Sequence, residues 1–349
     1  MVRIGVIGLG TIFKCAHLPQ LENIENCKIT AICDINTDKL KEYGDKLNID
    51  EKYRFTNYKD LIECEIVDAV EILTPNCFHI EMAKYAAQNK KAVEIEKPLS
   101  TDFSGVDELI KVIENNNTVN MMCFSYRFKP AVRYAKKLIE EGKLGKIVNV
   151  SVEYLKDSAF WSERRLEWRF IKSMAGSGVL GDLGVHLADM TKFLVGDFKT
   201  VYALKDIVVK ERLLETGDEK GKVETDDIVS FVAKLENDVL ANFTITRCAL
   251  GNANTITYKI YGTKGVINFN LNNPEELTYG ILENSDRHIE MITEKVPEEF
   301  LNSRQEQTFI NAVTGNKADF LPDVYEGAKC QRIIDAILES SETELPVEL

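Results

Sequence analysis

The chain has 349 residues, 44% of them hydrophobic and 28% charged. This length exceeds one ordinary core, so we expect two domains, and the composition is that of a globular protein, not a disordered or fibrous one. The formal net charge of -13 repels phosphate backbones and anionic lipid surfaces, which argues against generic nucleic-acid or membrane binding.

The first third of the chain alternates short apolar runs with helical segments. Strands are expected at Arg3–Ile7, Lys28–Cys33, Ala69–Leu73, Ala92–Ile95 and Val119–Phe124, and helices at Ile12–Leu21, Thr37–Leu47, Tyr58–Ile62, Cys77–Asn89 and Gly105–Asn115. Runs of Val and Ile without polar alternation are typical of parallel strands buried on both faces. The pattern predicts an α/β domain with a doubly wound parallel sheet over residues 1–124.

From Ser125 onward the pattern changes. Helices are expected at Pro130–Glu141, Val179–Leu194 and Tyr325–Ser340, with alternating strands at Ile147–Leu155, Asp227–Leu235, Val239–Thr246 and Thr255–Ile260 and a hairpin within Tyr261–Phe269. Alternation with a period of two indicates one buried and one open face. Residues 125–349 are therefore predicted to form an α+β domain with an open, mostly antiparallel sheet, joined to the first domain by a tight crossover near Phe124.

A glycine-rich loop follows the first strand. Gly8 and Gly10 in RIGVIGLGTIFK occupy the first two glycine positions of a dinucleotide fingerprint, whose backbone N–H groups approach a pyrophosphate at a helix N-terminus. The third position is Phe13, which prevents the closest helix–strand packing. Asp34 ends the second strand, where its carboxylate would accept hydrogen bonds from ribose hydroxyls and favour NAD over NADP. The expected cofactor-binding residues of this loop also include Thr11 and Ile12.

Two later strands end in polar loops at the same predicted sheet edge. The loop EILTPNCFH supplies Thr74, Pro75, Asn76 and His79 as cofactor-lining candidates, and AVEIEKPLS supplies Glu96 and Lys97. A lysine beside a nicotinamide ring suits proton transfer or polarisation of a carbonyl oxygen, although a surface lysine at a strand end is the plain alternative. We also predict a cis peptide bond between Lys97 and Pro98.

The second domain carries an aspartate and a histidine four residues apart, in AGSGVLGDLGVHLADM. On a helix Asp182 and His186 share one face, so the imidazole can accept a hydroxyl proton while the carboxylate orients the ring or holds the substrate. A structural hydrogen-bonded pair is the alternative. No second His or Cys lies at ligand spacing nearby, so we expect no metal site here. His288, in an alternating segment, is interpreted as structural.

Eight cysteines are scattered without a C-x-x-C pair, as expected of reduced and mostly buried thiols. No run reaches the ~18 apolar residues of a membrane helix, and the sequence starts with a strand-like segment instead of a signal peptide. These features favour a cytoplasmic protein.

The motifs in chain order resemble those of the Gfo/Idh/MocA oxidoreductases. They are GLGTIFKCAHLP, the strand end at Asp34, TPN-x-x-H, EKP, S-Y-R-F-K-P, W-R followed by G-x-G-x-x-x-D-x-G-x-H, and EGAKCQRIIDAILESS. The resemblance implies a Rossmann domain followed by a domain whose sheet supports the substrate and often the subunit contacts. Two departures are Phe13, in place of a small residue, and Ser177, which interrupts a glycine run.

The resemblance also assigns roles to residues. It implies that Lys97, Asp182 and His186 are catalytic, that Arg127 lies near the substrate, and that Trp168 and Arg169 lie near the cofactor and the rim of the active site. Trp161 is a further candidate for that rim.

The expected activity is hydride transfer between NAD(H) and a secondary hydroxyl of a sugar, cyclitol or sugar derivative, by a homodimer or homotetramer. The alternatives are a dihydrodiol dehydrogenase-like enzyme, an oxidoreductase that keeps its cofactor tightly bound, and a dinucleotide-sensing regulator without catalysis.

Overall fold

The computed structural model describes residues 1–161, 163–282 and 289–349, and it divides into two units. The first unit contains Met1–Phe124 and Arg304–Lys329, and the second contains Ser125–Ser303 and Cys330–Leu349. The sequence pattern predicted a second domain over all of residues 125–349, and the segment Arg304–Lys329 departs from that prediction.

The first unit is built on a six-stranded parallel sheet of order β3-β2-β1-β4-β5-β6. Its strands are β1 (Val2–Ile7), β2 (Cys27–Cys33), β3 (Arg54–Phe55), β4 (Ala69–Ile72), β5 (Ala92–Ile95) and β6 (Asn120–Met122). This is the predicted doubly wound sheet, and its strand order is that of dinucleotide-binding domains. The two-residue edge strand β3 was not anticipated, because it is too short to produce a hydrophobic pattern.

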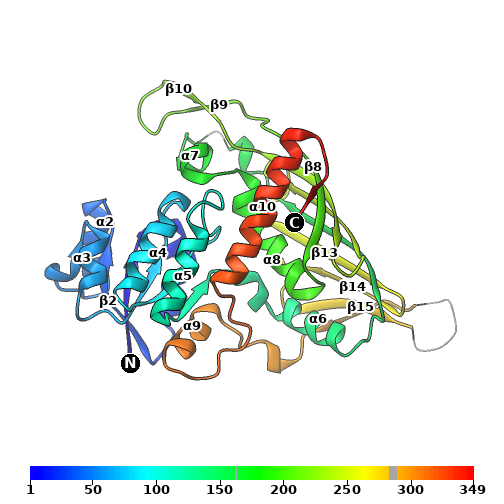
Figure 1. Ribbon diagram of the computed structural model, residues 1–349, viewed down its shortest axis with the longest axis horizontal. Coiled ribbons are helices and arrows are strands. Elements are labelled where there is room, and N and C mark those ends of the chain that lie inside the picture. The colour runs from blue at the N-terminus through cyan, green and yellow to red at the C-terminus, as the bar shows by residue number, and fades with distance from the viewer. Residues whose placement is uncertain (162, 283–288) are drawn as a thin grey trace. The chain divides into compact units, whose positions relative to one another are not determined.

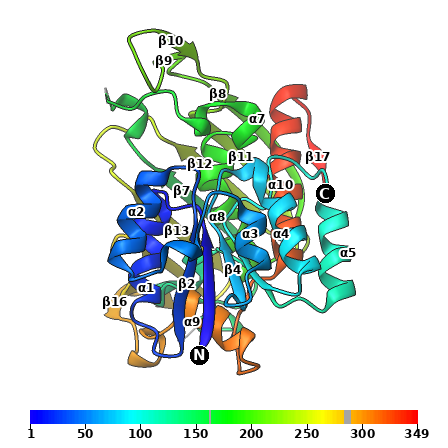
Figure 2. The same cartoon turned by 90° about the vertical axis from the view of Figure 1, so that its left-hand side faces the viewer.

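Helices cover both faces of this sheet (Figure 2). Short α1 (Leu18–Leu21) and α2 (Thr37–Lys46) lie on one side, and α3 (Tyr58–Glu63), α4 (His79–Gln88) and α5 (Val106–Asn116) lie on the other. Asn36 caps helix α2, and its side-chain oxygen accepts the backbone N–H groups of Asp38 at 2.9 Å and Lys39 at 3.2 Å. That cap satisfies two donors that the helix itself leaves unpaired.

Helix α9 (Gln305–Val313) explains why a late segment belongs to the first unit. Phe309 and Ile310 are fully buried in the same hydrophobic cluster as Val6 of β1 and Tyr43 of α2. The apolar face of α9 is therefore part of the first core, a long-range relation that periodicity along the sequence does not reveal.

The second unit contains a nine-stranded sheet of order β16-β15-β14-β13-β7-β12-β11-β8-β17. Its strands are β7 (Ile147–Leu155), β8 (Phe198–Asp206), β11 (Ile228–Leu235), β12 (Leu240–Thr246), β13 (Thr255–Gly262), β14 (Gly265–Asn270), β15 (Glu276–Ile281), β16 (Ile292–Lys295) and β17 (Val347–Glu348). Only the pair β12 and β7 is parallel among these described strands. The prediction of a mostly antiparallel sheet is thus confirmed, as is the hairpin of β13 and β14.

The helices of the second unit are α6 (Pro130–Glu140), α7 (Lys172–Ala175), α8 (Val185–Leu194) and most of α10 (Val324–Thr343), and a small ribbon pairs β9 (Glu211–Leu213) with β10 (Lys220–Lys222) (Figure 1). Strand β11 alternates strictly between buried and exposed residues from Val229 to Leu235. One face of the sheet therefore forms the core, and the other face is open. No helix in the described part of the chain has both the length and the apolar character that a bilayer crossing requires.

Candidate active site

The glycine loop after β1 has the backbone shape that the sequence predicted. Gly8 has φ of +100°, and a Cβ at this position would lie 2.6 Å from the carbonyl oxygen of Leu73, so only glycine fits. A Cβ on Gly10 would meet no atom within 4 Å. Gly10 therefore borders open space next to the loop, which is the condition for close approach of a ligand to the backbone.

Asp34 lies at the end of β2, directly beside this loop. Its Oδ2 accepts the backbone N–H of Leu9 at 2.8 Å, and its Oδ1 accepts that of Asn36 at 2.8 Å. Lys39 Nζ lies 3.8 Å from Oδ2. The carboxylate is thus held in place by backbone donors, while each oxygen keeps acceptor capacity for a further hydroxyl.

A helical segment begins immediately after the loop, with exposed Thr11 and half-buried Ile12, and continues into a π-helical turn, η1 (Phe13–His17). Phe13 is fully buried and packs edge-on against Tyr43 with 5.1 Å between ring centroids. The unusual third position of the fingerprint is therefore accommodated as a core residue between the first helical segment and α2. Single π-turns of this kind often occur near functional sites.

The TPN and EKP loops are tied together by His79. This residue begins α4 and is fully buried, with Nδ1 2.8 Å from the carbonyl oxygen of Pro98 and Nε2 2.9 Å from that of Thr74. Burial lowers the pKa of His79. Both ring nitrogens lie at hydrogen-bond distance from backbone carbonyl oxygens, and the neutral ring can donate to one of them, so His79 connects the two loops. Thr74 and Pro75 are half-buried, whereas Asn76 is buried.

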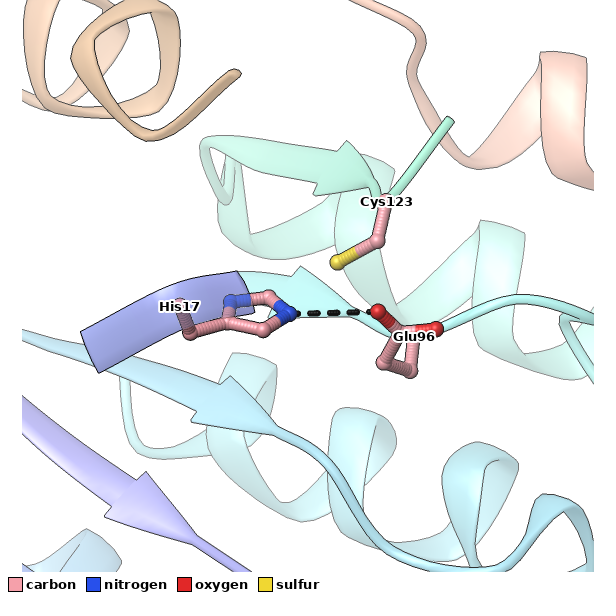
Figure 3. Close-up of side chains that lie close together, drawn as sticks. All are labelled: His17, Glu96 and Cys123. Carbon is pink, nitrogen blue, oxygen red and sulfur yellow. Dashed lines mark hydrogen bonds and ion pairs between the residues drawn. The ribbon is translucent and has the colours of Figure 1, made fainter. Parts of the chain in front are cut away.

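Glu96 points into the first unit, away from solvent, and its side chain approaches His17 (Figure 3). Its Oε1 lies 3.1 Å from His17 Nε2, and its Oε2 accepts the backbone N–H of Lys97 at 3.1 Å. Lys97 itself is half-buried, and the peptide bond to Pro98 is cis, as predicted. Glu96 therefore supports the backbone of the loop that carries Lys97.

In the second unit, Asp182 and His186 occupy consecutive helical segments. Asp182 lies in a π-helical turn, η7 (Leu180–Gly184), and His186 in α8. The expected helix is therefore present, but it opens with a wider turn than the α-helical spacing assumed for this pair. Asp182 is half-buried and His186 is 7% exposed. His288 lies outside the described residues.

Two tyrosines that are not among the predicted site residues lie near this pair. The ring of Tyr126 packs edge-on against His186 with 4.6 Å between centroids, and its hydroxyl lies 2.8 Å from that of Tyr154. Burial raises the pKa of Tyr154, and the nearby charge of Asp182 raises it further. The motif S-Y-R-F-K-P contained Tyr126, but only the fold brings Tyr154 of β7 beside it.

Arg127, the expected substrate residue, is 4% exposed and forms a bidentate ion pair with Asp189 of α8. Its guanidinium also lies 5.1 Å from the ring centre of Phe193. These contacts use Arg127 to anchor α8, the helix that carries His186. Direct contact with a substrate is a weaker interpretation of this geometry than positioning of that helix.

The tryptophan residues and Arg169 lie in the connection after β7. Trp161 is 52% exposed and donates its indole N–H to Asp157 Oδ1 at 3.1 Å. The guanidinium of Arg169 stacks over the ring of Trp168 at 4.3 Å and forms an ion pair with Glu167 at 3.3 Å. The three side chains are partly accessible, as residues at the rim of a site would be.

Comparison with known families accounts for both units. Residues 2–124 match the oxidoreductase family with an NAD-binding Rossmann fold, and residues 132–268 match the Gfo/Idh/MocA C-terminal domain. The chain belongs to the Gfo/Idh/MocA oxidoreductase family. The resemblance inferred from the motifs is therefore confirmed, as is the Rossmann fold with its NAD-binding character.

Several members of the family are similar to this chain. Levoglucosan dehydrogenase of Pseudarthrobacter phenanthrenivorans is 37% identical over 234 residues, which are 64% of this chain and 60% of that protein. Glucose-6-phosphate 3-dehydrogenase of Bacillus subtilis is 25% identical over 100% of this chain and 99% of its own. A solved levoglucosan dehydrogenase in complex with NADH and L-sorbose is 29% identical, with a TM-score of 0.90 over 100% of this chain and 98% of that one.

The residues of the first unit fit a dinucleotide. The open space at Gly10 would admit the pyrophosphate at the start of the first helical segment, and the fixed carboxylate of Asp34 would accept the adenine ribose hydroxyls. Both features belong to one loop and one strand end of the same sheet edge.

Proposed function

We propose that this protein is a dehydrogenase that oxidises a secondary hydroxyl group of a sugar or cyclitol, with NAD+ as the hydride acceptor. The observation that carries the proposal is the glycine loop with Asp34 fixed beside it, in a chain of an oxidoreductase family. Relatives named for levoglucosan and for glucose 6-phosphate support a sugar-like substrate.

The proposed division of labour follows the chemistry of the side chains. NAD+, when bound, accepts a hydride from the carbon that carries the hydroxyl group. We assign to Lys97 the hydrogen bond to that hydroxyl oxygen, which stabilises negative charge as the C–H bond weakens. His186 is assigned as the base that accepts the hydroxyl proton, and Asp182 as the group that orients His186 or holds the hydroxyl.

The remaining predicted residues receive supporting roles in this proposal. Thr11, Ile12, Thr74, Pro75 and Asn76 line the cofactor, and His79 and Glu96 hold the loops that carry such residues, in keeping with their buried contacts. Trp161, Trp168 and Arg169 form the rim of the site, and Arg127 anchors α8.

NAD is proposed in preference to NADP because of Asp34. A second phosphate on the ribose would place two negative charges beside a carboxylate that backbone donors hold fixed. Lys39, whose Nζ is 3.8 Å from Asp34 Oδ2, reduces this repulsion, but the negative charge of the Asp34 carboxylate remains.

We further propose a homodimer or homotetramer that forms through the open face of the large sheet. Leu204, Val232 and Leu240 project from neighbouring strands of that sheet and are 57%, 54% and 59% exposed. Apolar side chains grouped on an open sheet face are typical of subunit contacts. The proposed cytoplasmic location rests on the scattered cysteines of the sequence.

The test is an NAD+ reduction screen over levoglucosan, inositols, hexoses, amino sugars and hexose phosphates, with NADP+ run in parallel. With a substrate in hand, Lys97→Ala and His186→Ala are expected to lower kcat by roughly 10²–10⁴-fold while NADH binding remains. Lys41→Ala, which removes an exposed lysine of α2, is the matched control and should leave kcat unchanged.

Full turnover in Lys97→Ala or His186→Ala would contradict the assignment. NADH binding without turnover on any compound of the screen would instead favour the regulator. A nicotinamide cofactor that remains bound to the protein through purification and dialysis would indicate an oxidoreductase that keeps its cofactor tightly bound.

A further inference from the structure

Five ionisable side chains from distant parts of the sequence meet in the interior of the first unit. They are His17 of η1, Glu71 of β4, Glu94 of β5, Glu96 just after β5, and Glu306 of α9. Each is at most 8% exposed. A group of four carboxylates around one imidazole is unusual in a protein interior, because a buried charge is costly without a partner.

The imidazole of His17 is at the centre of the group. Its Nε2 lies 3.1 Å from Glu96 Oε1, and its Nδ1 lies 3.2 Å from Glu71 Oε2 and 3.5 Å from Glu306 Oε1. Figure 3 shows Glu96 facing one nitrogen of the ring while the other nitrogen is on the opposite side. The two sides of the ring thus have different partners.

Several of these buried atoms make no hydrogen bond. They are Nδ1 of His17, both carboxylate oxygens of Glu71, Oε2 of Glu94 and Oε2 of Glu306. By contrast, Glu94 Oε1 accepts the amide N–H of Gln305 at 3.0 Å. The atoms without hydrogen bonds are one nitrogen and four oxygens, all of them good ligands for a metal ion.

The cluster also lacks the usual counter-charges. In the residues that the structure describes, Glu71, Glu94 and Glu306 form no ion pair with a lysine or arginine, and His17 is the one cation available to Glu71 and Glu306. Among the described residues, no lysine or arginine therefore offsets a negative charge on these three carboxyl groups.

We propose that His17 Nδ1 and the carboxylates of Glu71, Glu94 and Glu306 bind one divalent transition-metal ion inside the Rossmann unit. Two donor atoms bound to one ion at about 2.1 Å are separated by roughly 3.0–3.4 Å. The separation of 3.2 Å from Nδ1 to Glu71 Oε2 is within that range, and Glu306 is placed beside the same nitrogen, with its Oε1 at 3.5 Å. Donor atoms of His17, Glu71 and Glu94 all lie within 4.8 Å of one another.

The surrounding contacts are those that a metal site requires. A histidine that binds a metal usually donates its second ring N–H to a carboxylate, which fixes the ring and its tautomer. Glu96 is placed to accept that N–H from Nε2 at 3.1 Å. Gln305 donates to Glu94 Oε1 at 3.0 Å and to Glu306 Oε1 at 3.3 Å, and so holds two of the carboxylates while leaving their other oxygens available.

The donor set selects the class of ion. One imidazole and three carboxylates suit Mn²⁺, Fe²⁺ or Zn²⁺, whereas soft ions prefer sulfur ligands. A second grouping, His17 with Glu96 and Cys123, would use the thiol and the opposite ring nitrogen. Cys123 already donates to Glu94 Oε1 at 3.5 Å, and the buried atoms without hydrogen bonds belong to His17 Nδ1, Glu71, Glu94 and Glu306, so the nitrogen–oxygen set is favoured.

Such an ion would act on the site structurally. It would fix His17, His17 would fix Glu96, and Glu96 Oε2 accepts the backbone N–H of Lys97. Ion binding itself involves neither substrate nor nicotinamide, so the inference stands or falls independently of the proposed dehydrogenase activity.

The experiment uses the full chain without a polyhistidine tag. Protein purified without chelators is analysed for metal by mass spectrometry, then stripped with a chelator and titrated with Mn²⁺ and with Zn²⁺. We expect about one ion per chain and a rise in Tm of roughly 5 °C when free Mn²⁺ exceeds Kd about 100-fold. Mn²⁺ is included because it prefers oxygen ligands and therefore binds poorly to the eight free thiols.

Variants define the ligands. Glu71→Gln and Glu94→Gln keep side-chain volume but remove charge, and each should weaken Mn²⁺ binding at least roughly tenfold and reduce the Mn²⁺-induced Tm shift. Glu65→Gln, an exposed residue of the same unit, is the matched control and should bind like the wild type. Cys123→Ala should also retain the ion.

The wild type alone can overturn the proposal, whatever the folding of the variants. Wild-type protein that carries no ion and shows no saturable Mn²⁺ or Zn²⁺ binding would mean that protons alone neutralise the cluster. Binding that survives Glu71→Gln and Glu94→Gln but is lost in Cys123→Ala would overturn the nitrogen–oxygen ligand set.

Discussion

At the scale of single residues, the two glycines of the loop after β1 separate folding from binding. Gly8→Ala must place a side chain at a φ of +100° and 2.6 Å from a backbone oxygen, so we expect it to lower the free energy of unfolding by about 1–3 kcal/mol. Gly10→Ala meets no neighbour within 4 Å, so the free energy of unfolding should change by less than about 0.5 kcal/mol.

The affinity for NADH should instead depend on Gly10. Because the Gly10 methyl group would occupy the proposed pyrophosphate space, Gly10→Ala should weaken NADH binding in a stably folded protein. Urea unfolding and NADH fluorescence titration measure the two effects. Wild-type affinity in Gly10→Ala would place the pyrophosphate elsewhere.

The tyrosine beside His186 offers a second test at this scale. Tyr126→Phe keeps the ring that packs on His186 but removes the hydroxyl that meets Tyr154 at 2.8 Å. Loss of one hydrogen bond worth about 1 kcal/mol should lower kcat/KM roughly fivefold if the hydroxyl pair orients the base. Tyr134→Phe loses a comparable bond, to Glu294 at 2.7 Å, and serves as the control. Equal activity in both variants would assign Tyr126 a packing role only.

At the scale of elements, local pattern predicts most of the molecule. Residues such as Val93 and Ile95 stand in a short apolar run between turn signals, and β5 forms where expected. The edge strand β3 was not predicted, because two residues are too few to show a hydrophobic period. The π-helical turns were not predicted, because their sequences have the pattern of an ordinary α-helix. The place of α9 was missed because its partners in the core are about 300 positions away in the sequence.

The assignment of α9 to the first unit leads to a specific prediction. Phe309 is fully buried among residues of the first sheet and its helices, so Phe309→Ala should lower the free energy of unfolding by about 3–5 kcal/mol. Hydrogen exchange should accelerate in β1 and β2, because the lost contacts belong to their core. Phe243→Ala, a matched change at a buried position of β12, should instead accelerate exchange in the second sheet. Acceleration of β11 and β12 by Phe309→Ala would contradict the division.

At the scale of the whole molecule, pattern and fold contribute different parts of the candidate site. The loops of Gly8, Asp34 and Lys97 could be predicted because each follows a strand, and parallel strands end at one edge. The glutamate cluster could not. Glu71 and Glu94 occupy the same position in two identical Ala-Val-Glu-Ile strands, yet only the register that pairs them brings the carboxylates together. Glu306 reaches them from another part of the chain through α9, so no spacing rule relates the three.

Assembly of the molecule provides the last prediction. Val232 is 54% exposed on the open face of the large sheet, and Leu204 and Leu240 are exposed on adjacent strands. A carboxylate buried in a subunit contact there would be left without a partner, so Val232→Glu should shift the mass measured by light scattering from oligomer to monomer. Leu250→Glu, which changes a 73% exposed turn residue, should leave the mass unchanged. An oligomer that persists in Val232→Glu would place the contact on another surface, and a monomeric wild type would remove the oligomer from the proposal.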